Sequence, residues 1–171
     1  MKNHFTALLL LLTVLVTGCK EKSEEVDPVL KTDGASLQLF FESEGHLTRL
    51  VDRVNDTLQV RWKPEWSGVV SEKVNDSTYL AYVALVPGIY HTQLNEQISN
   101  GNVQGYSRYL MFRATKNYTA YLATFYNNAI LNTPVDRDRF TGRVIFRNML
   151  TAEWKISEYE NGKLVSGWEP R

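Results

Sequence analysis

Residues 78–86 read Thr-Tyr-Leu-Ala-Tyr-Val-Ala-Leu-Val, a nearly continuous apolar run that is closed by Pro87-Gly88. An apolar run of this length between turn signals is typical of a strand buried on both faces. Such a strand lies at the centre of a sheet, because a strand with one wet face alternates polar and apolar residues. We therefore predict that residues 78–86 form the central strand of the fold.

Downstream of this run, the chain continues in strand-like segments. Residues 106–114 and 118–126 are rich in aromatic residues and are separated by Thr115-Lys116-Asn117, a spacing that predicts a tight hairpin. In the next segment, residues 140–147, every second residue is apolar or glycine, which predicts a strand. One face of this strand carries Phe140, Gly142, Val144 and Phe146. The opposite face carries arginines, so we expect one face to pack and the other to be wet.

The last hairpin is predicted by Asn161-Gly162, because both residues tolerate the positive φ angles of a type I′ turn. Residues 154–159 and 163–168 flank this turn as strands. In that register Glu160 faces Lys163, a pair of opposite charges that favours the hairpin. Together these segments predict a meander of antiparallel strands.

Upstream of the central strand, the sequence predicts one strand and one helix. Leu58, Val60 and Trp62 alternate with polar residues until Pro64 ends the strand. Ser36 is the expected N-cap of a short helix that ends near Gly45, and residues 46–54 keep a helical spacing that leaves a second helical turn open. The fold class is therefore predicted as α+β: a short N-terminal helix followed by a mainly antiparallel β-meander sheet.

The N-terminus carries an apolar run from Phe5 to Cys19 behind the positively charged Lys2. Its core, residues 7–16, has the length of a signal peptide rather than the roughly 20 residues of a membrane span. It resembles a bacterial lipoprotein signal peptide, with Cys19 as the lipid-modified residue after cleavage. We expect a signal peptide at 1–18, a charged, flexible tether at 19–33 and a single domain at 34–171.

A wider resemblance follows from two further motifs. Phe140-Thr141-Gly142, followed by Tyr159-Glu160-Asn161-Gly162-Lys163, resembles the ending of uncharacterised lipoproteins of Bacteroidota-type bacteria, and residues 62–66 are similar to their middle portion. The likeness covers residues 60–168 and carries no assigned activity. The charged tether resembles that of surface-exported members, which implies a lipid anchor in the outer membrane with the domain at the cell surface rather than in the periplasm.

The composition disfavours several classes of function. Removing residues 1–18 takes away Lys2 alone and leaves 18 basic against 19 acidic residues, so the clustered positive charge that nucleic-acid binding requires is not expected. Cys19 is the only cysteine, and the remaining histidines, His46 and His91, have no zinc-site spacing. No nucleophile elbow, phosphate loop or dinucleotide motif occurs. We predict no catalytic residues, no metal and no cofactor.

The sequence leaves three functions open. The leading hypothesis is a non-catalytic, lipid-anchored domain that binds an envelope protein or a glycan. The candidate ligand-binding residues are the aromatics Trp62, Trp66, Trp154, Tyr159 and Trp168. The second is a hydrolase of glycans or envelope material that uses Glu65, between two tryptophans, with another acid. The third is a structural subunit of an envelope complex.

Two tripeptides bear on modification. Asp56-Thr57-Leu58 and Asp76-Ser77-Thr78 resemble the O-glycosylation acceptor pattern of these bacteria, which makes Thr57 and Ser77 candidate glycosylation sites. The alternative is ordinary turn chemistry, because Asn and Asp side chains readily bond to nearby backbone groups.

Overall fold

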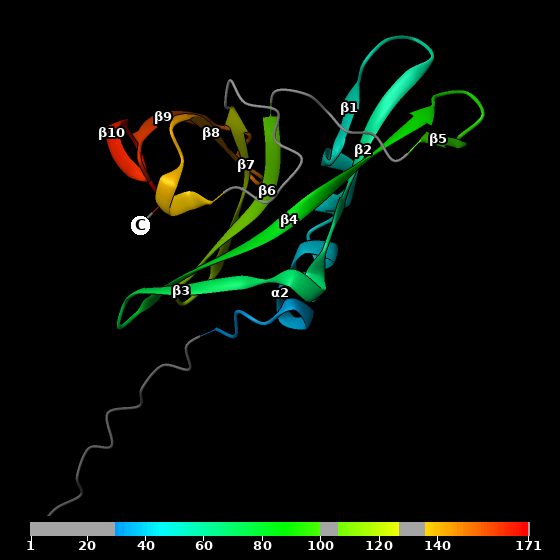
Figure 1. Ribbon diagram of the computed structural model, residues 1–171. Coiled ribbons are helices and arrows are strands. Elements are labelled where there is room, and N and C mark those ends of the chain that lie inside the picture. The colour runs from blue at the N-terminus through cyan, green and yellow to red at the C-terminus, as the bar shows by residue number, and fades with distance from the viewer. Residues whose placement is uncertain (1–29, 100–105, 127–135, 171) are drawn as a thin grey trace, which may run out of the picture.

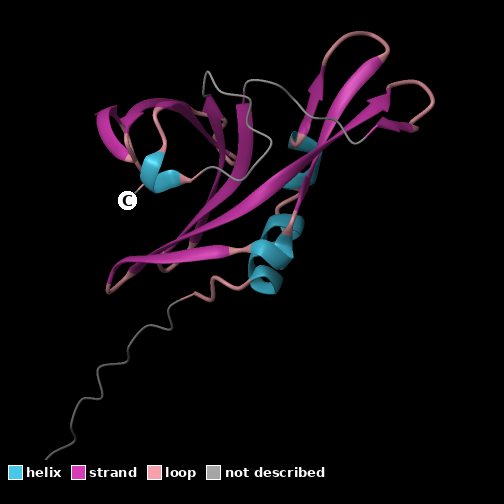
Figure 2. Cartoon of the chain, viewed as in Figure 1, coloured by secondary structure: helices cyan, strands magenta, loops and turns pink. Residues whose placement is uncertain are grey.

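The structure is a computed structural model, and it describes residues 30–99, 106–126 and 136–170. Within these residues the chain forms a ten-stranded, antiparallel sheet and one short α-helix, α2 (Figures 1 and 2). Eight strands follow the order β1-β2-β4-β6-β7-β8-β9-β10, and β3 and β5 also pair with β4. The strands are β1 (Val51–Arg53), β2 (Leu58–Pro64), β3 (Val70–Asn75), β4 (Thr78–His91), β5 (Gln97–Ser99), β6 (Tyr106–Ala114), β7 (Tyr118–Tyr126), β8 (Gly142–Asn148), β9 (Trp154–Glu160) and β10 (Lys163–Gly167).

Strand β4 is the centre of the sheet, as predicted. The first half of β4 pairs with β3 on one edge and with β6 on the other edge. The second half pairs with β2 on the edge of β3 and with β5 on the edge of β6. Leu80 lies on one face of the strand, and Ala81 and Val83 lie on the other. All three are at most 3 % exposed. In Figure 1 this long strand crosses the molecule diagonally and joins the β1–β2 hairpin to the curled half that ends in β10.

The predicted end of this strand at Pro87 is wrong, because β4 continues to His91. Trp62 on β2 lies opposite Pro87, and its backbone N–H donates to Leu50 at 2.8 Å, away from β4. The two residues therefore form a non-hydrogen-bonded pair, and the backbone nitrogen of Pro87 points away from β2. The nitrogen points to the other edge of β4, where the pairing with β6 ends at Ala84 and the pairing with β5 begins at Ile89. The missing N–H of proline thus removes no ladder bond within the described residues.

The meander of the second half agrees closely with the sequence prediction. Strands β6 and β7 have the predicted bounds and pair from Tyr106↔Tyr126 to Ala114↔Tyr118. Asn161 and Gly162 have φ angles of 49° and 75°, and Glu160 pairs with Lys163 as expected for the type I′ register. Val144 is fully buried while Arg143, its chain neighbour on the other face, is exposed.

The helix α2 (Gly34–Ser43) begins earlier than predicted. Its N-cap is Asp33 rather than Ser36: the Asp33 carboxylate accepts the backbone N–H of Ser36 at 3.0 Å, which lowers the pKa of Asp33. Gly45, with a φ of 68°, ends the helix as predicted. Residues 46–54 do not form another α-helical turn, because a 3-10 turn, η1 (His46–Arg49), leads directly into the edge strand β1.

Apolar side chains gather on both faces of the central strands. We call the first group the helix-side core; in it Leu37 and Phe41 of α2 pack with the odd-numbered face of β4, represented by Val83, and with Phe112 of β6. The second group, the tail-side core, lies on the opposite face, beneath the C-terminal segment. Its buried members are Met111, Ala123, Phe125, Phe140, Val144 and Phe146.

Some predictions fall outside the described residues. The signal peptide at 1–18, Cys19 and most of the tether belong to this part of the chain. In the described part, no helix combines the length and the apolar character needed to cross a bilayer.

The contact between α2 and the sheet gives a test of the fold. Phe41 is fully buried, and its ring centroid lies 6.1 Å from that of Phe112. We expect Phe41→Ala to lower the free energy of unfolding by about 3–5 kcal/mol, because it leaves a cavity under the helix. Leu39→Ala on the same helix, where Leu39 is 72 % exposed, should change it by less than about 0.5 kcal/mol. Urea denaturation measures both, and equal effects would contradict this account.

Candidate functional site: a carboxylate-rimmed pocket

A pocket of about 220 Å³ opens on the tail-side core. Its wall is formed by several strands, by the 3-10 turn η3 (Arg137–Arg139) and by the residues after β10. The strands are β3, β4, β6, β7, β8 and β9. Its floor consists of apolar side chains that are each at most 6 % exposed: Leu80, Met111, Phe125, Phe140 and Phe146. The floor is therefore closely packed.

The rim of this pocket is acidic. Glu72 of β3, Asp138 of η3 and Glu169 after β10 line it. Two tyrosine hydroxyls hold the glutamates: Tyr82 donates to Glu72 at 3.4 Å, and Tyr159 donates to Glu169 at 3.0 Å. Gly162 and Pro170 complete the described lining.

The strand register explains why these residues meet. Tyr82 lies directly opposite Met111, and Glu72 lies opposite Leu80, so all four share one face of the sheet. This placement follows from the two-residue period of β-strands.

The C-terminal segment closes the other side of the pocket. Gly167 has a φ of 102°, and a Cβ there would lie 2.2 Å from the carbonyl oxygen of Ile156, so glycine is required where the chain turns after β10. The buried Ser157 then fixes the segment, because its hydroxyl donates to the carbonyl of Trp168 and accepts the Trp168 N–H at 3.1 Å. Glu169 is thereby carried to the rim.

The chemistry of the lining is limited. Among the described residues that form it, none is a serine, threonine, cysteine, histidine or lysine that could act as a nucleophile or an amine base. Among the described residues, no group of three or more His, Cys, Asp and Glu side chains is arranged to hold a metal ion. Arg113, the β6 neighbour of Leu80, lies near Tyr121, outside the lining. Three carboxylates and two phenols are the ionisable groups among the described residues of the lining.

The five predicted ligand-binding aromatics do not share one surface. Tyr159 lines the pocket, and Trp168 packs beside it, with its ring centroid 5.8 Å from that of Phe146. Trp154 is 63 % exposed on the opposite face of β9. Trp62 and Trp66 belong to the helix-side core. The sequence thus identified one residue of the lining and one that packs against its floor.

Trp62 serves an internal polar cluster. It is 4 % exposed, and its indole N–H donates to Asp52 at 2.8 Å. Asp52 also forms an ion pair with Arg108, whose guanidinium lies 4.9 Å from the Trp62 ring and 5.2 Å from the Tyr106 ring. Burial raises the pKa of Tyr106, although the positive charge of Arg108 opposes the shift. This cluster joins β1, β2 and β6.

Glu65, the acid of the hydrolase hypothesis, is exposed at the end of β2. It lines a second, open cleft of about 650 Å³ with residues such as Arg61 and Tyr90, and it is the only carboxylate among the described residues of that lining. A glycosidase needs two carboxyl groups on either side of the scissile bond. The described residues of the cleft therefore supply no second acid for the hydrolase hypothesis.

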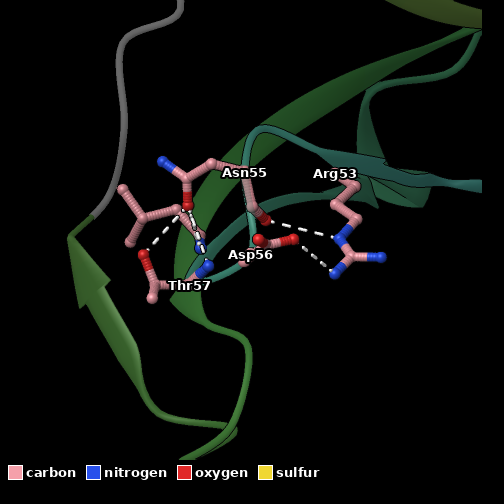
Figure 3. A network of polar contacts seen from close by, with 5 residues as sticks. Arg53, Asn55, Asp56 and Thr57 are labelled. Atoms are coloured by element: carbon pink, nitrogen blue, oxygen red, sulfur yellow. Dashed lines mark hydrogen bonds and ion pairs between the residues drawn. The ribbon is translucent and has the colours of Figure 1, made fainter.

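Thr57 and Ser77 both lie in exposed hairpin turns of the same design. Figure 3 shows the turn of Thr57. The Asn55 side chain accepts the backbone N–H and the hydroxyl of Thr57, both at 2.9 Å. Asn75 accepts the same two groups of Ser77, at 3.0 and 3.1 Å. A basic residue three positions before the aspartate forms an ion pair with it in each turn. The turn chemistry weighed in the sequence is thus present, and glycosylation of the two hydroxyls stays a prediction.

His46 differs from what its position near a helix end suggests. It is 3 % exposed and packs against Phe41, with ring centroids 5.3 Å apart, while Glu42 and Glu44 are exposed. Its Nδ1 has no hydrogen-bond partner within the described residues. Burial lowers the pKa of His46, and Arg49 adds to the shift while Glu44 opposes it.

This burial predicts a pH dependence of stability. Because the folded-state pKa of His46 lies below its unfolded value of 6.5, the unfolded chain takes up the proton first as the pH falls. The stabilisation is therefore complete above pH 6.5 and is lost towards lower pH. We expect His46→Phe to flatten the fall in unfolding free energy between about pH 7.5 and 5. Urea denaturation across this range measures the slope, and an unchanged slope would refute the assignment.

The residues that sequence reasoning missed are the rim acids and the pocket floor. A pattern of period two marks the floor residues as buried, but nothing local brings β3, η3 and the C-terminal segment together. A scan against protein-family models finds no match to this chain, and searches of curated proteins and of solved structures find none either. Function must therefore be argued from the pocket and from the sequence of the N-terminus.

Proposed function

We propose that the protein is a lipid-anchored α+β lipoprotein of the cell envelope that binds a ligand in the carboxylate-rimmed pocket without catalysing a reaction. The observation that carries the binding part is the pocket itself: a concave site with a buried apolar floor and a few polar groups at its mouth. The apolar run before Cys19 supports the anchor. We place the anchor in the outer membrane, with the domain at the cell surface.

The lining supports binding over catalysis. Nucleophilic catalysis needs a serine, cysteine, threonine or lysine beside a base, and the part of the lining that the structure describes offers none of these residues. Acid–base catalysis by paired carboxylates remains the second candidate function, because Glu72, Asp138 and Glu169 line one pocket. In that case the hydrolase hypothesis moves from Glu65 to the rim. A volume of about 220 Å³ is below the roughly 300–1,000 Å³ of typical ligand sites, which favours a small ligand group over a saccharide chain.

The anchor is tested at Cys19. Cells that express the wild-type chain and take up labelled palmitate should yield a labelled protein in the outer-membrane fraction, because each buried methylene of an acyl chain contributes about 0.8 kcal/mol. Cys19→Ser should abolish the label and release the protein from the membrane after export. Ser23→Ala, a change within the tether, should leave both unchanged. Labelled, membrane-bound Cys19→Ser protein would contradict the anchor, and resistance of intact cells to protease shaving would contradict surface display.

Ligand binding is tested through two methionines. Met111 is in the pocket floor and Met149 is in the helix-side core, and both are buried. The detergent-solubilised protein, with ¹³C-labelled methionine methyl groups, is titrated with envelope glycan fragments, short peptides and small amines. We expect at least one class to move the Met111 signal in a saturable way and to leave Met149 in place. If no class moves Met111, binding at this pocket is refuted; new reducing ends during the glycan titration would instead support the hydrolase.

A further inference from the structure

We propose that the open cleft beside Glu65 binds a small organic acid, whose carboxylate is held by Arg61 and Lys63 while its apolar body lies against the sheet. The cleft shares no described lining residue with the carboxylate-rimmed pocket, so it is a second site and does not rest on the first. Its volume of about 650 Å³ lies within the roughly 300–1,000 Å³ of small-molecule sites. The inference is carried by an arginine that neutral groups hold in place on the sheet.

The two cations of the cleft lie on one face of the sheet. Arg61 and Lys63 are two residues apart on β2, so their side chains project from the same face. On β4, Arg61 lies opposite Gly88 and Lys63 lies opposite Val86. Helix α2 packs on the other face, with the buried ring of Trp62. The two positive charges therefore stand together on the face that the helix leaves uncovered.

Neutral groups from three elements fix the guanidinium of Arg61. Its Cζ lies 4.4 Å from the centroid of the Tyr90 ring, and that ring extends over Gly88, where a Cβ would come within 2.9 Å of it. The side-chain amide of Gln59, with its oxygen towards Arg61, accepts from Nη2 at 2.6 Å and from Nε at 2.9 Å. The Asn95 side chain also accepts from Nη2. Strands β2 and β4 and the loop before β5 thus position one positive charge.

This charge has no carboxylate partner among the described residues. The ion pairs in that part of the chain involve other basic residues, and neither Arg61 nor Lys63 takes part in one. Nη1 of Arg61 donates to none of the described groups, so its two N–H donors remain for a ligand. Glu65, the acid of the described lining, follows the end of β2, four residues beyond Arg61. A guanidinium that is already positioned binds an anion without giving up an internal ion pair.

The surroundings of the two cations favour a carboxylate on an apolar body over a phosphate. Phosphate sites commonly use backbone N–H groups at a helix N-terminus or in a turn, whereas the N–H groups of a strand point along the sheet to its neighbours. Val51 and Val86 are 40 % and 41 % exposed on the face of the cations, and Leu47 and Pro87 line the same cleft. An apolar body gains free energy by burial against these side chains. The ligand therefore combines one carboxylate with an apolar part.

The test uses the valine methyl signals of the detergent-solubilised full protein. Val86 lines the cleft, and Val144, which is fully buried in the tail-side core, is the internal reference. Hexanoate is titrated at pH 7 beside 1-hexanol and hexylamine, which share the apolar stem but carry no charge or a positive charge. We expect hexanoate to move the Val86 signal in a saturable way that weakens as salt is added. The alcohol and the amine should bind at least about tenfold more weakly.

Matched variants assign the binding to the two cations. Arg61→Gln removes the positioned charge and should lower hexanoate affinity about tenfold or more. Lys63→Gln removes an exposed charge without breaking any described contact, and it should lower the affinity about threefold, as expected for an exposed ion pair. Arg53→Gln changes a cation of β1 that lies outside the described lining and pairs with Asp56, and it should leave the affinity unchanged. An unshifted Val144 signal shows that each variant is folded.

Several outcomes would overturn the inference. Equal binding of hexanoate and 1-hexanol would remove the role of the carboxylate, and full hexanoate affinity in Arg61→Gln and Lys63→Gln would remove the role of the cations. Tighter binding of hexyl phosphate than of hexanoate would assign the cleft to phosphates. Tighter binding of acetyl-Gly-Gly-Leu with a free C-terminus would assign it to a peptide end. If no ligand moves Val86, the cleft is not a binding site, whereas the pocket of the proposed function is judged by Met111 alone.

Discussion

The fold depends on one strand being buried on both faces. Strand β4 is long enough to have two partners on each edge, and its alternate side chains enter two different cores. One face, represented by Val83, meets α2, and the other, represented by Leu80, reaches the pocket. Because interiors are close-packed, a change on either face of β4 is transmitted to both halves of the sheet. The helix and the pocket are therefore built on the same support.

The two cores have different covers, and this difference determines where the pocket lies. The helix α2 covers the first core with whole apolar side chains, Leu37 and Phe41, which are fully buried. The second is covered by η3 and by the segment after β10, which contribute acids and Pro170 as well as aromatic rings. Irregular segments close a core less completely than a helix does, so space remains between them. The pocket is this incompletely covered part of the second core.

Several polar side chains that the sequence offered as candidates for binding or modification lie in clusters or turns that hold the fold together. Asp52, Arg108 and Trp62 form a partly buried cluster that joins three strands. Asn55 and Asn75 close two turns of the same design. Removing one partner of a buried polar group leaves the other without compensation, so such clusters constrain substitution without taking part in binding. The carboxylates of Glu72 and Glu169 are also held by partners, the hydroxyls of Tyr82 and Tyr159, and they line the pocket as well.

The sequence by itself determined the strands of the second half, the central position of β4 and the Asn161-Gly162 register, because these depend on local periodicity and turn geometry. It did not determine the end of β4, since the tolerance of Pro87 depends on which edge of the strand is unpaired. The sequence did not predict the pocket either. Glu72, Asp138 and Glu169 come from segments far apart in the chain, and they meet only because the sheet curls and Ser157 holds the C-terminal segment against it. Long-range contacts of this kind leave no local signal, so tertiary structure alone decided where the pocket lies.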